Sequence, residues 1–164
     1  MKKISLILFA GLLWFSTANG QNEKFKALFI YNFTNYIDWP GGTGSTFVIA
    51  VYGDSPIISE LQAISKIKKV GSASIEVRKI STTAEIGNAQ IVFVPAQKKR
   101  SLSEINQALS GKPTLIISDL ATSDFGINFI VVGGKQSFQT SKLNIEMHKL
   151  KVNSSLIALG TLVN

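Results

Sequence analysis

The sequence of 164 residues has no cysteine and a single histidine, His148. The lack of cysteine excludes thiol nucleophiles, disulfides, iron–sulfur clusters and the lipid-acceptor cysteine of a lipoprotein. One imidazole cannot build a histidine-rich metal site, so no metal centre is predicted. Because His148 lies in a polar stretch beside Glu146 and Lys149, we expect it on the surface rather than in a catalytic site.

Long apolar runs are also scarce. The run Ile4–Phe15 follows a short basic start and precedes the small residues Ala18 and Gly20, which is the pattern of a secretory signal peptide. It is shorter than the roughly 18 to 20 residues that a membrane-spanning helix needs. Residues 1–20 are therefore predicted to be a signal peptide that is cleaved before Gln21, so that the rest of the chain is exported to the periplasm.

Charged residues make up only 16% of the chain, while hydrophobic residues make up 45%. This composition predicts one globular domain over residues 21–164, without a membrane span. Removing residues 1–20 takes away two lysines, so the net charge falls from +7 to +5. For an exported protein this surplus favours an anionic membrane surface, an anionic wall polymer or an acidic partner protein over nucleic acid. Two small basic groups contribute, although solvated loop charge is the favoured interpretation of both: Lys66, Lys68 and Lys69, and Lys98, Lys99 and Arg100.

The order of the apolar segments predicts an α/β fold. Apolar residues recur at helical spacing over residues 22–38, and Trp39-Pro40 is expected to end that helix. Four short apolar runs then alternate with helical segments, which indicates three layers with a mostly parallel sheet between helices. The predicted strands are Phe47–Tyr52, Ile75–Ile80, Gln90–Pro95 and Thr114–Ser118.

The C-terminal part of the chain changes pattern. The runs Ile127–Val132 and Gln136–Thr140 flank two glycines, and this predicts an antiparallel hairpin. Two closing helices are expected at residues 141–149 and 154–163. The second would contain Gly160 at a cost of about 1 kcal/mol relative to alanine.

Catalytic motifs are weak. No glycine-rich phosphate loop follows a strand and opens a helix, so no nucleotide or other cofactor is expected. Asp54 and Asp119 each follow a predicted strand, and they would share one sheet edge if those strands were parallel neighbours. With Ser55, such an edge could bind a small ligand or catalyse hydrolysis. Helix capping by Asp54, Ser55 and Asp119 is the favoured alternative.

Aromatic residues gather at the end of the first predicted helix, just before Pro40. Core packing is the favoured interpretation of this cluster, yet rigid aromatic groups with a charged rim are also what protein interfaces use. The candidate partner-binding residues are therefore Tyr36, Trp39 and Pro40, with Lys98, Lys99 and Arg100 as the charged rim.

Four segments carry a resemblance to a known family. They are Phe25–Pro40 with its Trp-Pro corner, the turn Gly53–Pro56, the segment Gly126–Phe129 followed by Phe138, and Leu150–Leu156. In this order they resemble the opening helix, first strand-to-helix turn, late hairpin and last-helix start of the YfiR-like bacterial periplasmic proteins. The chain departs from the family at residues 139–141 and 149, and it lacks the cysteines that some members use for disulfides.

The resemblance implies an exported α/β domain without catalytic activity. The best understood members of the family restrain a membrane-bound diguanylate cyclase by binding its periplasmic domain. It therefore implies, as partner, the periplasmic domain of an inner-membrane signalling protein such as a diguanylate cyclase or a sensor kinase, and a role in cyclic-di-GMP signalling. Two alternatives stay open: a homodimer, and a small-ligand-binding domain or hydrolase that uses Asp54 and Asp119.

Overall fold

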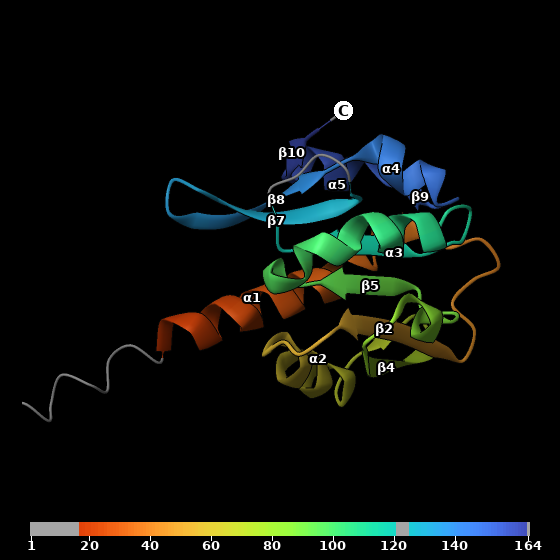
Figure 1. Cartoon of the computed structure of the whole chain (residues 1–164), viewed down its shortest axis with the longest axis horizontal. Coiled ribbons are helices and arrows are strands. Elements are labelled where there is room, and N and C mark those ends of the chain that lie inside the picture. The colour runs from red at the N-terminus through yellow and green to blue at the C-terminus, as the bar shows by residue number, and fades with distance from the viewer. Residues whose placement is uncertain (1–16, 121–124, 164) are drawn as a thin grey trace, which may run out of the picture.

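In the computed structural model, an eight-stranded sheet curls through the centre of the molecule with helices on both of its faces (Figure 1). The structure describes residues 17–120 and 125–163, so most of the predicted signal peptide, residues 1–16, lies outside the described part. The predicted α/β fold is confirmed, including the mostly parallel sheet and the C-terminal antiparallel hairpin.

The large sheet is mostly parallel. Its strands are β2 (Thr46–Tyr52), β3 (Lys69–Val70), β4 (Ala73–Ile80), β5 (Ile91–Val94), β6 (Leu115–Ser118), β7 (Ile127–Val132), β8 (Lys135–Thr140) and β10 (Thr161–Leu162). They follow the order β10-β8-β7-β6-β5-β2-β4-β3. Strands β4, β2, β5, β6 and β7 run parallel to one another, whereas β3 and β8 are antiparallel to their neighbours β4 and β7. A separate two-stranded sheet pairs β1 (Ile37–Asp38) with β9 (Lys151–Val152).

Helices cover the two faces of the large sheet and enclose two apolar cores. They are α1 (Thr17–Phe33), α2 (Ile57–Ser65), α3 (Leu102–Ala108), α4 (Lys142–Met147) and α5 (Ser154–Leu159), with short 3-10 helices η1 (Thr83–Ile86) and η2 (Ala96–Ser101). Successive residues of a strand face opposite sides of the sheet. Ile49 of β2 therefore joins the core under α1 and α2, while its neighbour Ala50 joins the core under α3.

The first helix ends earlier than its periodicity predicts. α1 stops at Phe33 rather than at residue 38. The backbone N–H groups of Thr34, Asn35 and Tyr36 donate to carbonyls three residues back, which closes the helix with tight turns. The next two residues then leave the helical path because they pair with Lys151–Val152 as β1 and β9. That pairing partner lies far along the chain, so local periodicity carries no sign of it.

The predicted last helix is also too long. α5 ends at Leu159, Gly160 is extended with φ −112° and ψ −169°, and β10 adds to the sheet beside β8. A Cβ atom on residue 160 would lie 2.7 Å from Cδ2 of the Phe138 ring and 2.9 Å from the Phe138 carbonyl oxygen. Glycine is therefore required here by the close approach of β8, and not tolerated within a helix as the sequence suggested.

None of the helices in the described ranges combines the length and the apolar character needed to cross a membrane.

Candidate functional site

The carboxyl edge of the sheet holds the predicted ligand-edge residues, but its two carboxylates are not on adjacent strands. Asp54 follows β2 and Asp119 follows β6, and β5 lies between these strands. Ser55 Oγ accepts a hydrogen bond from the backbone N–H of Ile57 at 3.4 Å, at the start of α2. Asp54 does not cap the helix with its carboxylate, which pairs instead with Lys79 Nζ at 2.8 Å in full contact with solvent. The structure thus places a capping serine and two separate carboxylates along this edge.

The exposed ion pair of Asp54 and Lys79 shifts the pKa of both side chains. The hydrogen bond from Lys79, together with its positive charge, lowers the pKa of the Asp54 carboxyl, and the same bond raises the pKa of the Lys79 amine. The lowered pKa makes the Asp54 carboxylate a weaker proton acceptor, and Lys79 already occupies its Oδ1, so it is poorly suited to take a proton from a substrate.

Asp119 belongs to an ion-pair cluster around the buried Lys26 amine, which the sequence analysis missed. Lys26 Nζ lies 2.7 Å from Asp119 Oδ2 and 2.9 Å from Glu23 Oε1, and the Lys26 side chain is only 4% exposed. Burial by itself lowers the pKa of Lys26, but the hydrogen bonds to Asp119 and Glu23 outweigh it, so the pKa is raised above its ordinary value. The amine stays protonated between its two carboxylates. This cluster fastens α1 to the carboxyl end of β6.

The predicted aromatic corner is divided between core and surface. Trp39 is buried; its Nε1 donates to the Gln90 carbonyl oxygen at 3.2 Å, and its ring packs edge-on against Phe47 with centroids 5.0 Å apart. Tyr36 is half-buried and Pro40 is exposed. Trp39 is thus a core residue, and Tyr36 and Pro40 are the parts of the corner that a partner can reach.

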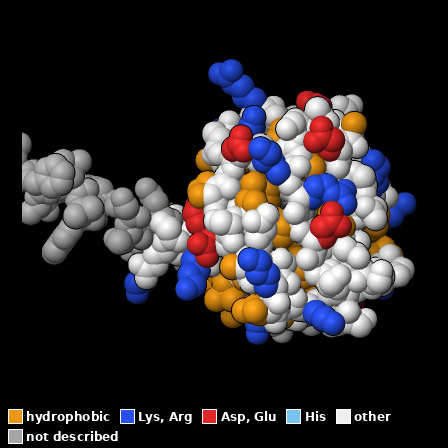
Figure 2. Space-filling view, turned by 90° about the horizontal axis from the view of Figure 1, so that it is seen from below, with side chains coloured by type: hydrophobic (Ala, Val, Ile, Leu, Met, Phe, Trp, Pro, Cys, Tyr) orange, Lys and Arg blue, Asp and Glu red, His pale blue; other side chains and the backbone are white. Residues whose placement is uncertain are grey.

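The predicted charged rim lies at the opposite end of β5 from Trp39. Lys98, Lys99 and Arg100 belong to η2, which follows the carboxyl end of β5. Trp39, in contrast, bonds to Gln90, the residue before the amino end of the same strand. The aromatic corner and this basic group are therefore at opposite sheet edges. Figure 2 likewise shows Lys and Arg side chains scattered over the face that it presents, with no single basic patch.

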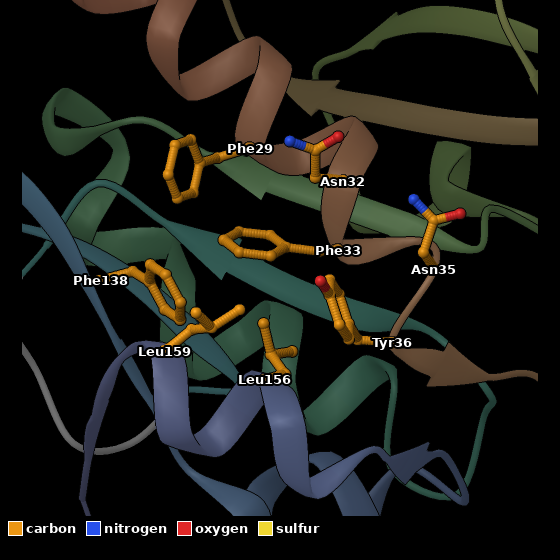
Figure 3. Close-up of a pocket in the computed structure, with 8 residues that line it drawn as sticks. All are labelled: Phe29, Asn32, Phe33, Asn35, Tyr36, Phe138, Leu156 and Leu159. Carbon is orange, nitrogen blue, oxygen red and sulfur yellow. The ribbon is translucent and has the colours of Figure 1, made fainter.

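A groove of about 410 Å³ lies between the end of α1, strand β8 and helix α5 (Figure 3). Eight residues line it: Phe29, Asn32, Phe33, Asn35, Tyr36, Phe138, Leu156 and Leu159. In Figure 3 the aromatic rings point toward one another and toward the leucines of α5, while the two asparagine amides lie on the side away from the leucines. The groove therefore has an apolar interior and amide groups at its rim.

Ring-to-ring contacts form the floor of this groove. Phe33 and Phe138 meet edge-on with centroids 5.0 Å apart, and Phe29 and Phe138 lie 5.8 Å apart. Phe33 and Phe138 are buried, whereas Leu159 on the wall is 63% exposed. Tyr36 carries the one titratable side chain among the lining residues. Such a surface suits the binding of an apolar side chain rather than proton transfer.

Sequence reasoning found only one side of this groove. It placed Tyr36 among the candidate residues but left out Phe138, Leu156 and Leu159. The apolar face shared by Leu156 and Leu159 was visible in the sequence, yet nothing local indicates that it faces Tyr36. The backbone bond from Asn153 N–H to the Tyr36 carbonyl oxygen, at 2.8 Å, is what brings the start of α5 to the end of α1.

His148 is buried, so its predicted surface position is wrong. Its Nδ1 lies 2.9 Å from the Leu109 carbonyl oxygen, and its Nε2 lies 3.0 Å from Asn106 Oδ1. A carbonyl oxygen can only accept, so Nδ1 carries a proton. The polar neighbours Glu146 and Lys149 are exposed, but the turn that ends α4 directs His148 against α3. Among the described residues, no three His, Asp or Glu side chains gather in a way that could hold a metal ion.

A comparison with known protein families gives a match over most of the chain. The model of the YfiR/HmsC-like family matches residues 23–161, which takes in every strand of the fold except the last residue of β10. A search of the curated proteins finds no significant match.

Proposed function

Because the chain belongs to the YfiR/HmsC-like family, we propose that it is an exported, non-enzymatic regulator that restrains a membrane-bound signalling protein by binding that protein's periplasmic domain. The family match is the observation that carries this proposal, since it covers residues 23–161 of the chain. A diguanylate cyclase is the proposed partner, with a sensor kinase as the other candidate. Residues 21–164 would form the mature periplasmic domain.

We further propose that the groove between α1 and α5 is the contact surface for this partner. Protein interfaces use rigid aromatic residues with accessible apolar groups around them, and the groove combines the ring floor of Phe33 and Phe138 with the exposed Leu159. Tyr36, from the predicted partner-binding set, lies in this groove, and Asn32 and Asn35 offer hydrogen bonds at its rim. Pro40 would then make a secondary contact, whereas Lys98, Lys99 and Arg100, at the opposite sheet edge from the aromatic corner, would have to meet a separate part of the partner.

The ligand-edge alternative has less support. Asp54 and Asp119 each bind a different lysine, and β5 separates their strands. Asp54→Asn leaves the fold and the regulation intact if Asp54 has no reaction to catalyse. Asp54→Asn is a better test of the ligand edge than Asp119→Asn, because Asp119→Asn would also weaken the ion pair with Lys26 and so could change the stability of the fold.

The contact surface can be tested with one matched pair of variants. Leu159 is 63% exposed in the groove, and Leu143 is 62% exposed on α4, outside the groove lining. Leu159→Glu should abolish recovery of the partner when the tagged protein is pulled down from detergent-solubilised membranes, because it places a charge in the apolar groove. Leu143→Glu should leave recovery unchanged. Equal recovery with both variants would refute the groove as the contact surface.

Two other points of the proposal can be tested. If the groove is occupied by a second copy of the chain, size-exclusion chromatography should show a dimer that Leu159→Glu dissociates. Export is tested by the intact mass of protein taken from the periplasm, which should correspond to a chain starting at Gln21. A dominant species that retains residues 1–20 would contradict export with cleavage.

A further inference from the structure

A second surface, separate from the groove, joins α1 to the turn after α2. Lys68 Nζ lies 5.9 Å from the centre of the Tyr31 ring, and the Tyr31 hydroxyl donates to the Lys69 carbonyl oxygen at 3.4 Å. Residues three or four positions apart are neighbours on a helix, so Leu28 and Lys24 continue this surface along α1 from Tyr31. We call these residues the basic–apolar face: Lys24, Leu28, Tyr31, Lys66, Ile67, Lys68 and Lys69.

The apolar residues of this face project into solvent. Ile67, in the turn after α2, is 78% exposed, and Leu28 is 48% exposed. An isolated exposed isoleucine is unremarkable in itself. Ile67, however, lies between Lys66 and Lys68 in the sequence, and both lysines are exposed. Lys68 in turn contacts the Tyr31 ring, which links Ile67 to the surface of α1. Figure 2, which looks at the molecule from the side of α2, shows apolar, basic and acidic side chains mixed over that side.

The lysines of this face have no anionic partner within the described residues. None of Lys24, Lys66, Lys68 and Lys69 forms an ion pair there. Of the carboxylates on the two helices, Glu23 is committed to Lys26, and Glu60 on α2 is in no ion pair within the same residues. The two helices thus supply one carboxylate outside an ion pair, against the four lysines of this face. The face is complementary to a surface of negative charge.

We propose that the basic–apolar face binds an anionic phospholipid bilayer, with Ile67 inserted between headgroups and the lysines placed on lipid phosphates. This combination of a few exposed apolar side chains, one aromatic ring and surrounding lysines is what interfacial membrane binding uses. A protein interface would offer a broad, well-packed apolar centre, whereas here the apolar groups are small in number and separated by charges.

The proposal goes beyond the regulator function and is compatible with it. On α1, successive residues are rotated by about 100°, so Phe29 and Phe33 of the groove lie on a different side of the helix from Lys24, Leu28 and Tyr31. One copy can therefore contact lipid through the basic–apolar face while the groove stays open to a membrane protein. Such docking would confine the search for that partner to the membrane surface.

The expected strength follows from the charges. A lysine near an anionic membrane surface strengthens binding about fivefold, and the effect decays within a Debye length of about 10 Å at 0.1 M salt. Losing two lysines should therefore weaken binding by about thirtyfold. Burying Ile67 among headgroups should contribute about tenfold.

Vesicle co-sedimentation of the purified mature protein tests these values. The probes are vesicles of phosphatidylglycerol and phosphatidylcholine in a one-to-three ratio, and vesicles of phosphatidylcholine alone. Wild type should bind the first and not the second, and high salt should release it. The double variant Lys66→Glu/Lys68→Glu should lose at least about thirtyfold in binding. Lys69 is left unchanged because it pairs with β4 as part of β3.

Matched control variants distinguish an effect of the basic–apolar face on vesicle binding from an effect of net charge or of any exposed apolar side chain. Lys112→Glu/Lys135→Glu changes the net charge equally at exposed lysines elsewhere, and it should keep most of the binding. Ile67→Ser should lose about tenfold, whereas Val131→Ser, at a 63% exposed site on the hairpin, should lose nothing. Thermal unfolding of every variant checks that the fold is kept.

Three results would overturn the proposal. The first is no binding of wild type to anionic vesicles at about 0.1 M salt. The second is an equal loss in both lysine double variants, which would reflect net charge alone. The third is unchanged vesicle binding by Lys66→Glu/Lys68→Glu together with loss of the membrane partner in the pull-down, which would make the face a protein interface. Failure of Leu159→Glu to affect the partner would bear on the groove only, so the two proposals fail separately.

Discussion

Adding one methyl group at position 160 should destabilise the protein by about 1 to 3 kcal/mol, the usual cost of overpacking a core. Gly160 has φ −112°, which any residue adopts, so alanine brings no backbone strain. The cost is steric, because the new Cβ would lie 2.7 Å from Cδ2 of Phe138 and 2.9 Å from its carbonyl oxygen. The Phe138 ring cannot move away freely, since it packs against Phe33 and Phe29.

Thermal and urea unfolding of Gly160→Ala measure this cost. For a domain of this size, 1 kcal/mol corresponds to about 2 to 4 °C in the melting temperature, so the cost of about 1 to 3 kcal/mol should lower it by about 2 to 12 °C. Trp39 is the only tryptophan beyond residue 20, and it is buried against Phe47, so its fluorescence reports unfolding. Repeating the substitution in a Phe138→Leu background should reduce the cost by more than about 0.5 kcal/mol, because the overlapping ring is gone.

The sign of the change is the decisive result. If residue 160 were inside a helix, alanine would stabilise the protein by up to about 1 kcal/mol. A Gly160→Ala variant with an increased melting temperature would therefore refute the packing of β10 against β8. An unchanged cost in the Phe138→Leu background would show that the ring is not the obstacle.

Three further predictions concern the core and the buried polar groups. Phe33→Ala should cost about 3 to 5 kcal/mol because its ring is fully buried, and the half-buried Phe29 should cost less; urea midpoints in the reverse order would contradict the described packing. Lys26→Met should be less stable than wild type at pH 8, because it leaves Asp119 without its cation. Because the pKa of Lys26 is raised in the folded protein, its ionised amine contributes its full stabilisation below the lysine pKa of the unfolded chain, about 10.4, and this stabilisation is lost as the pH rises through the higher folded pKa. Equal unfolding free energies of Lys26→Met and wild type at pH 8 would argue against the ion pair. His148→Ala should cost about 1 to 3 kcal/mol by removing the hydrogen bonds that the buried imidazole makes with the Leu109 carbonyl oxygen and with Asn106, and a variant as stable as wild type in urea would place His148 at the surface.

The sequence by itself determined the fold class and the family. The strands Phe47–Tyr52 and Thr114–Ser118 were predictable because both of their faces are buried, which requires continuous apolar runs whatever their neighbours are. The hairpin was predictable because two glycines between strands specify a tight turn. The four family motifs could likewise be recognised because each is a short continuous segment and they occur in the family's order along the chain. These features depend on residues that are close together in sequence.

Only the tertiary structure decided the sites. The end of α1, the extended Gly160 and the burial of His148 each depend on a segment far away in the sequence: β9, β8 and the end of α3 respectively. The partly buried pair of Lys26 and Asp119 joins residues 93 positions apart. The groove likewise needs α1, β8 and α5 side by side. Local propensity is weak compared with the free energy of burying such groups against distant partners, so tertiary packing overrides it at the surfaces that carry the proposed functions.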